Sequence, residues 1–409
     1  MDVATTANLL QVLRDPTGVP SHPLIFQVLM VFTWIPHIVF VNLTLGSALL
    51  ALVAFNRRNH PDWARLSEAM TKVAKVGVSL LVVLGVAPLL FTQTIYDPQW
   101  YASNVLSAAW VIGFIFTLII GYLAWFTFYF KNHGEHAPNW AGWLGGFGLV
   151  MFLLDGFIMH VLAFQGLLPD QWASWFAPGG QVDMSGTGIH AWQAGRFGFY
   201  LAMSATVFGA FLMAYADYFA PRADRPAPYR AFVHQLGARV ALAGALAQLG
   251  LLALWLLQVP ASLGLWAHPM SWLLILYLGV LVALFWRLRA SMTGAGYLVL
   301  ALTVGMAALV AIFREVVRMA YLAPFSYDAL DYKVIWDYPT FVMFLLTLLG
   351  VGGLMGGFII TTAYKAGRVS GVYEADVVVS RLATGSLAST IVWVVAFIGT
   401  GIWIWLRNN

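Results

Sequence analysis

Long apolar runs alternate with short polar connections from one end of the chain to the other. A helix that crosses the hydrocarbon core of a bilayer needs about 20 predominantly apolar residues. Ten runs meet this requirement, and the pattern predicts spans at residues 24–55, 70–95, 104–130, 139–167, 188–217, 230–258, 264–286, 293–323, 336–363 and 377–406. We therefore predict an all-α integral membrane protein with a single membrane domain, residues 1–409, because no connection offers a separate soluble domain.

The composition supports a membrane protein and restricts its chemistry. Of 409 residues, 61% are hydrophobic and only 9% are charged, whereas soluble domains carry about 25% charged residues. We attribute the small net charge of +4 to the connections between helices and expect no nucleic-acid partner. Because cysteine is absent, disulfides, iron–sulfur clusters and c-type haem attachment are excluded. Any redox centre in this chain must therefore be held by histidine, methionine or a carboxylate.

Lysine and arginine are distributed unevenly between the two sets of connections. One set carries Arg57, Arg58, Arg65, Lys131, Arg222, Arg225, Arg230, Arg287, Arg289, Lys365 and Arg368. The opposite set holds Lys333, with Arg14 and Arg407 on the tails. Because cytoplasmic loops are enriched in lysine and arginine, we predict that both termini lie on the outer, periplasmic side of a bacterial inner membrane. His133 and His136 then lie in inner connections.

Polar residues within and beside the predicted spans gather towards the outer half of the bilayer. A polar or charged group in hydrocarbon is costly, so such residues are candidates for a functional site. Imidazole and thioether groups ligate haem iron, and arginine can pair with haem propionates. We therefore expect non-covalently bound haem among these residues. The group comprises His37, Asp155, His160, His190, Arg196, His268, Met270, Arg314, Glu315 and Arg318.

Several of these residues also have a purely structural interpretation. His160 lies close enough to the outer edge to be an interfacial residue. His268 could cap the start of a span, and Met270 could fill the core. Arg314 could extend its charged end towards water. His37 is the hardest to explain structurally, because it lies in the middle of its span.

Three segments resemble subunit I of the cytochrome bd quinol oxidases. "HIVFVNLTLGSALL" (37–50) is similar to the first-helix segment of that family, and "HAWQAGRFGFYLAMSATVFGAFLMA" (190–214) to its fifth-helix segment. "REVVR" (314–318) is similar to its eighth-helix E-x-x-R segment. The order of these segments, their depth and their residue types agree over residues 24–323, the bd-like helices 1–8; residues 336–409 supply two further helices.

The resemblance implies roles for individual histidines. His37 would correspond to a haem ligand of the oxygen-reducing pair of the family. His190 would correspond to the ligand of the low-spin haem b. The sixth ligand of that haem comes from the seventh helix, where Met270 or His268 is available.

The resemblance also assigns the eighth helix. Glu315 would bind the high-spin haem b, and Arg318 would lie beside it. A spacing of three residues also places both side chains on one helix face, where they could satisfy each other. Arg196 and His160 complete the residues that we expect to bind cofactor. The expected cofactors are two or three haems b, one of which could be a modified haem, and a quinone is a further candidate.

The chain departs from the family in four respects. The connection at 259–263 is a tight turn, where the family has a long loop that shapes the quinol site. Residues 104–130 contain no Asp or Glu, although the third helix of the family carries acids that serve its proton path. The Gly-Arg-Gln-Pro-Trp block after the eighth-helix glutamate is missing, and a tenth span is present. From these differences we expect an altered quinol site, or none, at that connection, and weaker support for proton delivery to oxygen.

We therefore predict a haem b-bearing subunit of a respiratory membrane oxidoreductase. It would move electrons between the quinone pool and oxygen, or an outer-face partner such as cytochrome c. Its partners would be membrane lipid and other subunits, with a small membrane subunit and a c-type cytochrome as candidates. One alternative is a proton-coupled secondary transporter in which Asp155, Glu315 and Arg318 line a pathway. Another is a cofactorless membrane anchor of a peripheral dehydrogenase.

Overall fold

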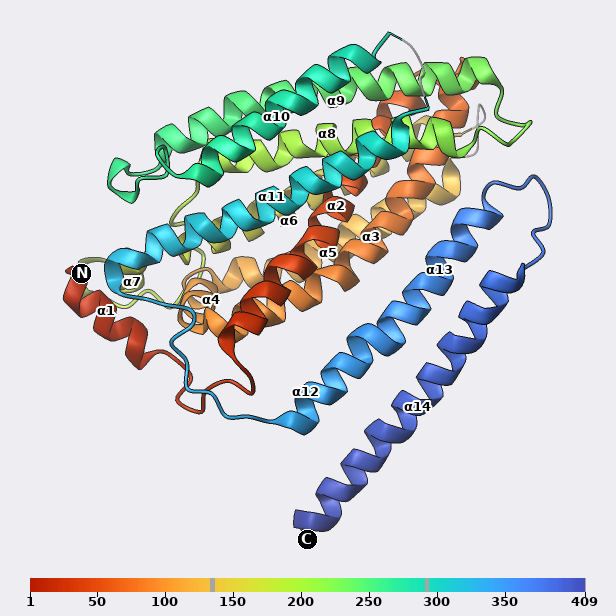
Figure 1. The fold of residues 1–409 in the computed structure, drawn as a ribbon. Coiled ribbons are helices and arrows are strands. Elements are labelled where there is room, and N and C mark those ends of the chain that lie inside the picture. Colours follow the sequence, from red (N-terminus) through yellow and green to blue (C-terminus); the bar gives the residue numbers. More distant parts are fainter. Residues whose placement is uncertain (133–136, 291–293, 409) are drawn as a thin grey trace. The chain divides into compact units, whose positions relative to one another are not determined.

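A computed structural model describes residues 1–132, 137–290 and 294–408, so His133 and His136 lie outside the described residues. Ten helical segments in this part of the chain are long and apolar enough to cross a membrane, which confirms the ten spans predicted from the sequence. They are α2 (Pro23–Phe55), α3 (Pro61–Ile95), α5 (Ala108–Lys131), α6 (Asn139–Gln165), α8 (Ala194–Tyr218), α9 (Ala227–Gln258), α10 (Pro269–Leu288), α11 (Gly296–Leu322), α12 (Tyr338–Leu345) with α13 (Gly353–Ala366), and α14 (Val377–Asn408) (Figure 1). The chain is therefore a multi-pass membrane protein.

Three short helices accompany the spans: α1 (Val3–Val12), α4 (Asp97–Leu106) and α7 (Trp172–Phe176). The break between α4 and α5 falls at Ser107, whose φ of −126° and ψ of 35° are not helical. The hydroxyl of Ser107 donates to the backbone oxygen of Gly188, 2.7 Å away. The third span therefore begins at Ala108, four residues after the predicted 104.

Two further helix starts differ from the apolar pattern for identifiable reasons. α3 begins at Pro61, where the side chain of His60 accepts a hydrogen bond from the backbone N of Asp62 and proline fits the first turn. This helix thus continues through a polar segment that an apolar criterion does not detect. α8 begins at Ala194 and not at 188. The backbone N of His190 donates to the side chain of Gln165 at 2.9 Å, so His190 lies in the connection before the helix.

The chain forms two compact units, of which the larger comprises Met1–Pro16, Pro23–Asp217 and Ala231–Tyr332. In this larger unit α2 packs along α3, and α5 packs along α6 (Figure 1). A buried aromatic cluster joins α8, α9 and α11, because the ring of Trp255 lies 5.7 Å from that of Phe199 and 5.2 Å from that of Phe313. Such tilted and edge-on contacts are favourable geometries for aromatic pairs. The candidate site described below lies within this unit.

The smaller unit comprises Thr17–His22, Tyr218–Arg230 and Lys333–Asn409. An isolated parallel bridge joins Val19 to Val334. α13 packs against α14, and a π-helical segment, Leu346–Gly352, links α12 to α13. The spans Tyr338–Ala366 and Val377–Arg407 bury none of their most apolar windows. Their side chains are therefore suited to a hydrocarbon environment.

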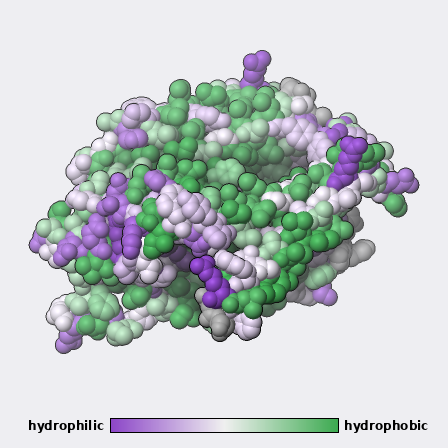
Figure 2. Space-filling model, turned by 60° about the horizontal axis from the view of Figure 1, so that its bottom comes forward, coloured by the Kyte–Doolittle hydropathy of each residue, from purple (hydrophilic) through white to green (hydrophobic). Residues whose placement is uncertain are grey.

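Apolar side chains also cover much of the face shown in Figure 2. Exposed examples on the larger unit are Val83 (70%), Leu123 (61%) and Leu276 (66%). A soluble protein rarely exposes extended apolar surface, whereas a membrane protein presents it to lipid.

Candidate functional site

A cavity of about 130 Å³ lies inside the larger unit, between α2, α3, α4, α6 and α11. One face of α3 forms its long wall, with Gly85, Pro88, Leu89, Thr92 and, directly after the helix, Tyr96. These positions recur at helical spacing, and the rise of about 1.5 Å per residue makes the wall roughly 16 Å long. The cavity is therefore an elongated cleft and not a compact hole.

His37 lines the cavity from α2. Its Nδ1 lies 2.9 Å from the backbone oxygen of Leu81, so the hydrogen of the neutral ring is assigned to Nδ1. A Cβ added at Gly85 would lie only 2.8 Å from Cε1 of the ring, so glycine at this position leaves the space that the imidazole occupies. A histidine whose one nitrogen donates to a carbonyl presents the other, here Nε2, as a metal ligand.

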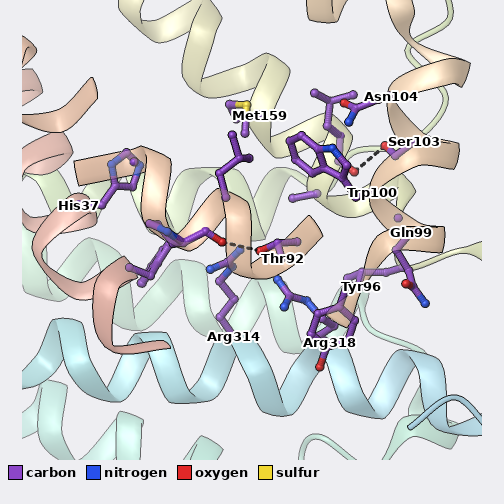
Figure 3. A pocket seen from close by; sticks show the side chains of 18 residues that line it. His37, Thr92, Tyr96, Gln99, Trp100, Ser103, Asn104, Met159, Arg314 and Arg318 are labelled. Atoms are coloured by element: carbon purple, nitrogen blue, oxygen red, sulfur yellow. Dashed lines mark hydrogen bonds between the residues drawn. The ribbon is translucent and has the colours of Figure 1, made fainter. Parts of the chain in front are cut away.

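Arg314 and Arg318 line the same cavity from α11. Figure 3 shows their side chains rising from the helix, with His37 and Gln99 at opposite sides of the view. Both arginines contact aromatic rings: Cζ of Arg314 lies 4.9 Å from the ring of Trp34, and Cζ of Arg318 lies 4.3 Å from that of Tyr96. Cations over ring faces are attracted to them. The cavity thus combines one oriented imidazole with two guanidinium groups.

Glu315 is the centre of a completed polar cluster. Its Oε2 lies 3.0 Å from Nη1 of Arg318, and its Oε1 accepts from Nε2 of Gln27 at 2.9 Å. The hydroxyl of Tyr96 also donates to Oε1. The mutual satisfaction of Glu315 and Arg318 expected from their spacing is confirmed. An iron ligand at Glu315 would have to replace part of this cluster, so its proposed haem role stays a prediction.

His160 and His190 hold the segment that precedes α8. His160 is buried, and its Nε2 accepts from the backbone N of Gln193 at 3.1 Å. Nε2 of His190 lies 3.2 Å from the backbone oxygen of Leu106, and the imidazole stacks on Trp175 at 5.2 Å. These contacts are structural, and neither residue lines the cavity.

The remaining sequence candidates lie at the start of α10 and on α6. His268 is the N-cap of α10, and its Nδ1 accepts from the backbone N of Met270 at 3.2 Å. Met270 packs against the apolar core. Asp155 is buried on α6 and accepts a hydrogen bond from Thr117 of α5. The roles expected for His190, His268 and Met270 at a low-spin haem also stay predictions.

A second polar cluster, which the apolar pattern did not reveal, lies where α4 begins. Oδ1 of Asp97 accepts from the hydroxyl of Tyr332, and Oδ2 accepts from the backbone N of Asp15 at 2.7 Å. Tyr327 contacts both Tyr332, at 2.8 Å between hydroxyls, and the ring of Tyr96, at 6.0 Å between centroids. Burial raises the pKa of Asp97 despite these hydrogen bonds. Burial and the nearby Glu315 carboxylate raise the pKa of Tyr96 well above its usual value, so this tyrosine acts as a donor.

Comparison with solved structures shows which known fold the chain resembles. The chain is similar to a chain in "The structure of bd oxidase from Geobacillus thermodenitrificans", with a TM-score of 0.60 and 14% sequence identity, over 92% of this chain and 99% of that chain. This protein has a bd oxidase fold. No family model matches the sequence, and no curated protein matches it in sequence either. The bd oxidase resemblance found in short segments is therefore confirmed at the level of fold, in a strongly divergent sequence.

The residues that line the cavity include types that could hold a haem. His37 offers an imidazole nitrogen whose orientation is set by Leu81. Arg314 and Arg318 supply positive charge beside it, where propionates would be favoured. Trp34 and Leu167 supply apolar lining. The residues present therefore fit a haem with one histidine ligand.

Proposed function

We propose that the chain is a haem b-bearing subunit of a bd-like respiratory membrane oxidoreductase. It moves electrons between the quinone pool and oxygen, or an outer-face partner such as cytochrome c. The observation that carries this proposal is His37, an imidazole inside a membrane span whose Nδ1 is held by a backbone carbonyl and whose ring lines a cavity. The bd oxidase fold supports it.

In this proposal each residue around the cavity has a separate task. Leu81 holds the proton of His37 on Nδ1, which keeps Nε2 unprotonated and available to iron. Arg314 and Arg318 favour the negatively charged edge of the bound molecule. The surrounding apolar side chains exclude water, which strengthens these interactions. Bound haem b would supply a one-electron redox centre.

A second haem follows only from the family resemblance. His190, with His268 or Met270, would hold this second haem. Glu315 and Arg318 would lie at a third haem. In the structure these residues form the structural contacts described above, so we place the first haem at His37. Other subunits of a respiratory complex would supply the remaining partners.

The test is the reduced-minus-oxidised absorption spectrum of the purified protein, recorded with and without carbon monoxide. We expect haem b bands in the wild type and their loss or marked reduction in His37→Ala. His60→Ala is the matched control, because His60 is an exposed histidine outside the cavity. Bands that shift with carbon monoxide would indicate an open coordination position and favour oxygen reduction. Unshifted bands would favour electron transfer alone.

Two results would contradict the proposal. Absence of haem from the wild type would leave the transporter and the membrane anchor as interpretations. An unchanged spectrum in folded His37→Ala would show that haem binds elsewhere, and His190→Ala would then be the next variant to examine.

A further inference from the structure

The polar cluster at the start of α4 contains a continuous chain of oxygen atoms. Oδ1 of Asp97 contacts the hydroxyl of Tyr332, which lies 2.8 Å from the hydroxyl of Tyr327. The hydroxyl of Tyr327 in turn lies 2.8 Å from the backbone oxygen of Ile95. All three side chains are buried, so the protein itself must supply the hydrogens of this chain.

A count of hydrogens shows what the chain lacks. Each tyrosine supplies one hydroxyl hydrogen, and a backbone carbonyl supplies none. When Asp97 is ionised, the contacts from Asp97 to Ile95 number one more than the hydrogens available to them. Tyr327 can then donate to Ile95 or to Tyr332, but its single hydrogen cannot fully serve both. A protonated carboxyl group has one O–H donor, so a proton on Asp97 supplies the missing hydrogen.

The charges around Asp97 do not replace this proton. Among the described residues, no basic side chain forms an ion pair with Asp97. Arg14 lies over the two tyrosine rings, with Cζ 4.3 and 4.5 Å from their centroids, and its guanidinium donates to the backbone oxygens of Asp328 and Asp331. The side chains of Asp328 and Asp331 are exposed.

Three influences on the carboxyl group oppose one another. The backbone N of Asp15 donates to Oδ2 at 2.7 Å, and Asp97 lies in the first turn of α4. Both features favour the ionised form, as does the positive charge of Arg14. Burial at 4% exposure disfavours an anion that has no ion pair, and it is the strongest influence, so the pKa of Asp97 is raised.

We propose that Asp97 is a proton-binding site and that its proton reverses the direction of this hydrogen-bond chain. In the ionised form Tyr332 donates to Oδ1, and one contact further along lacks a hydrogen. In the protonated form Oδ1 donates to Tyr332, Tyr332 donates to Tyr327, and Tyr327 donates to the backbone oxygen of Ile95. Every contact is then satisfied, and hydrogen bonds in such a chain strengthen one another.

The proton joins segments that are distant in the sequence. Asp97 begins α4, Ile95 ends α3, and Tyr327 and Tyr332 follow α11. The backbone N of Asp15, which follows α1, donates to Oδ2 in either form because the proton lies on Oδ1. Loss of the proton should therefore loosen the contact between α4 and the segment after α11.

The site lies beside the cavity and is separate from it. Tyr96 lines the cavity, and its ring lies 6.0 Å from that of Tyr327. Asp97, Tyr327 and Tyr332 do not line the cavity. The inference does not rest on the proposed haem function, so either can fail without the other.

Infrared absorption of the purified full-length protein, recorded as a function of pH in H2O and D2O, tests the proposal. A protonated carboxylic acid has a carbonyl stretching band that an ionised carboxylate lacks, and exchange of the acid proton for deuterium shifts this band. The difference between wild type and Asp97→Asn isolates Asp97. We expect an acid band at low pH that disappears as pH rises through the raised pKa.

The decisive variant is Tyr327→Phe, which removes only the hydroxyl at the far end of the chain. In the protonated form Tyr332 then has no acceptor, whereas in the ionised form it still donates to Asp97. The midpoint of the Asp97 titration should therefore fall by about one pH unit, as for the loss of one hydrogen bond from the protonated form. Tyr101→Phe, at a position that is 59% exposed, is the control and should leave the midpoint unchanged.

Two results would overturn the proposal. One is an unchanged or raised midpoint in Tyr327→Phe, because a hydroxyl that donates towards Asp97 stabilises the ionised form and its loss would raise the midpoint. The other is the absence of an Asp97 acid band at every pH at which the protein is folded. Asp97→Asn should fold, since its amide N–H donates to Tyr332 as the acid does. If it does not fold, the spectrum of wild type minus Tyr327→Phe, recorded between the two midpoints, shows the same band without a change at Asp97.

Discussion

Three charged residues of α11, Arg314, Glu315 and Arg318, lie within little more than one helical turn. They differ in whether the chain supplies them with an ion-pair partner. Glu315 receives hydrogen bonds from Arg318, Gln27 and Tyr96, so every partner of this buried carboxylate comes from the chain itself. Arg314 has no carboxylate partner among the described residues. The same is true of Arg196 on α8, which lines the same small recess of about 10 Å³. The Glu315 cluster is complete within the chain, whereas Arg314 and Arg196 form no ion pair among the described residues.

This difference separates structural from functional polar residues within one membrane domain. Ionisable groups in a membrane span are expensive in both cases, but only the incomplete cluster needs something from outside to offset the cost. Arg314 and Arg318 both line the cavity, so the clusters differ in their ion pairing and not in their position. Removing a charge should therefore have opposite effects at the two places.

The largest effect is expected at the complete cluster. Glu315→Ala leaves Arg318 buried without its carboxylate and removes the acceptor of Tyr96 and Gln27. Loss of one partner of a buried ion pair costs about 3–5 kcal/mol. The free energy of unfolding, measured by chemical or thermal unfolding in detergent, should decrease by this amount. Glu68→Ala, at an exposed position, is the control. A decrease below about 1 kcal/mol would mean that the cluster does not stabilise the fold.

A smaller decrease is expected when one donor is lost from the same cluster. Tyr96→Phe keeps the ring beneath Arg318 and removes only the hydroxyl that donates to Glu315. Hydrogen bonds to charged groups contribute about 1.5–3 kcal/mol, so the free energy of unfolding should fall by that amount. Tyr101→Phe is the control, since Tyr101 is 59% exposed. Equal stability of the two variants would argue against the hydrogen bond.

Sequence patterns predicted the membrane spans and one ion pair, but they did not predict the contacts between distant segments of the chain. The ten spans follow directly from apolar runs of sufficient length, since the bilayer imposes that length. The Glu315–Arg318 pair follows from a spacing of three on one helix. Both depend on residues that are close in sequence.

The partners that complete the clusters come from distant parts of the chain. Gln27 and Tyr96 meet Glu315 across 288 and 219 residues, and neither helix periodicity nor composition specifies such lateral contacts. His190 was expected inside a span, but a hydrogen bond from its backbone to Gln165 keeps it in the connection before α8. The position of a histidine within a predicted span therefore does not show whether its side chain faces a cavity, as that of His37 does.

An effect of opposite sign is expected at the incomplete cluster. Arg196→Met replaces a buried guanidinium, whose Nε and Nη1 have no hydrogen-bond partner, with an apolar side chain of similar length. Replacing buried charges by apolar residues can stabilise a protein by about 1–4 kcal/mol, and we expect a gain of about 1 kcal/mol in the ligand-free protein. The unfolding temperature measured without added ligand checks this. Destabilisation equal to that of Glu315→Ala would show that the chain already satisfies Arg196.

The smallest effect is expected at Asp97, which belongs to the polar cluster at the start of α4 and whose carboxylate accepts two hydrogen bonds. Burial raises the pKa of this group from 3.8, so the folded protein binds more protons than the unfolded chain at pH values between 3.8 and the raised pKa. The free energy of unfolding should therefore fall as pH rises through this window and level off above it. Asp97→Asn should remove this contribution and flatten the pH dependence of the unfolding temperature. Asp331→Asn, at an exposed position, should leave the slope unchanged. A slope that persists in Asp97→Asn would assign the titration to another group.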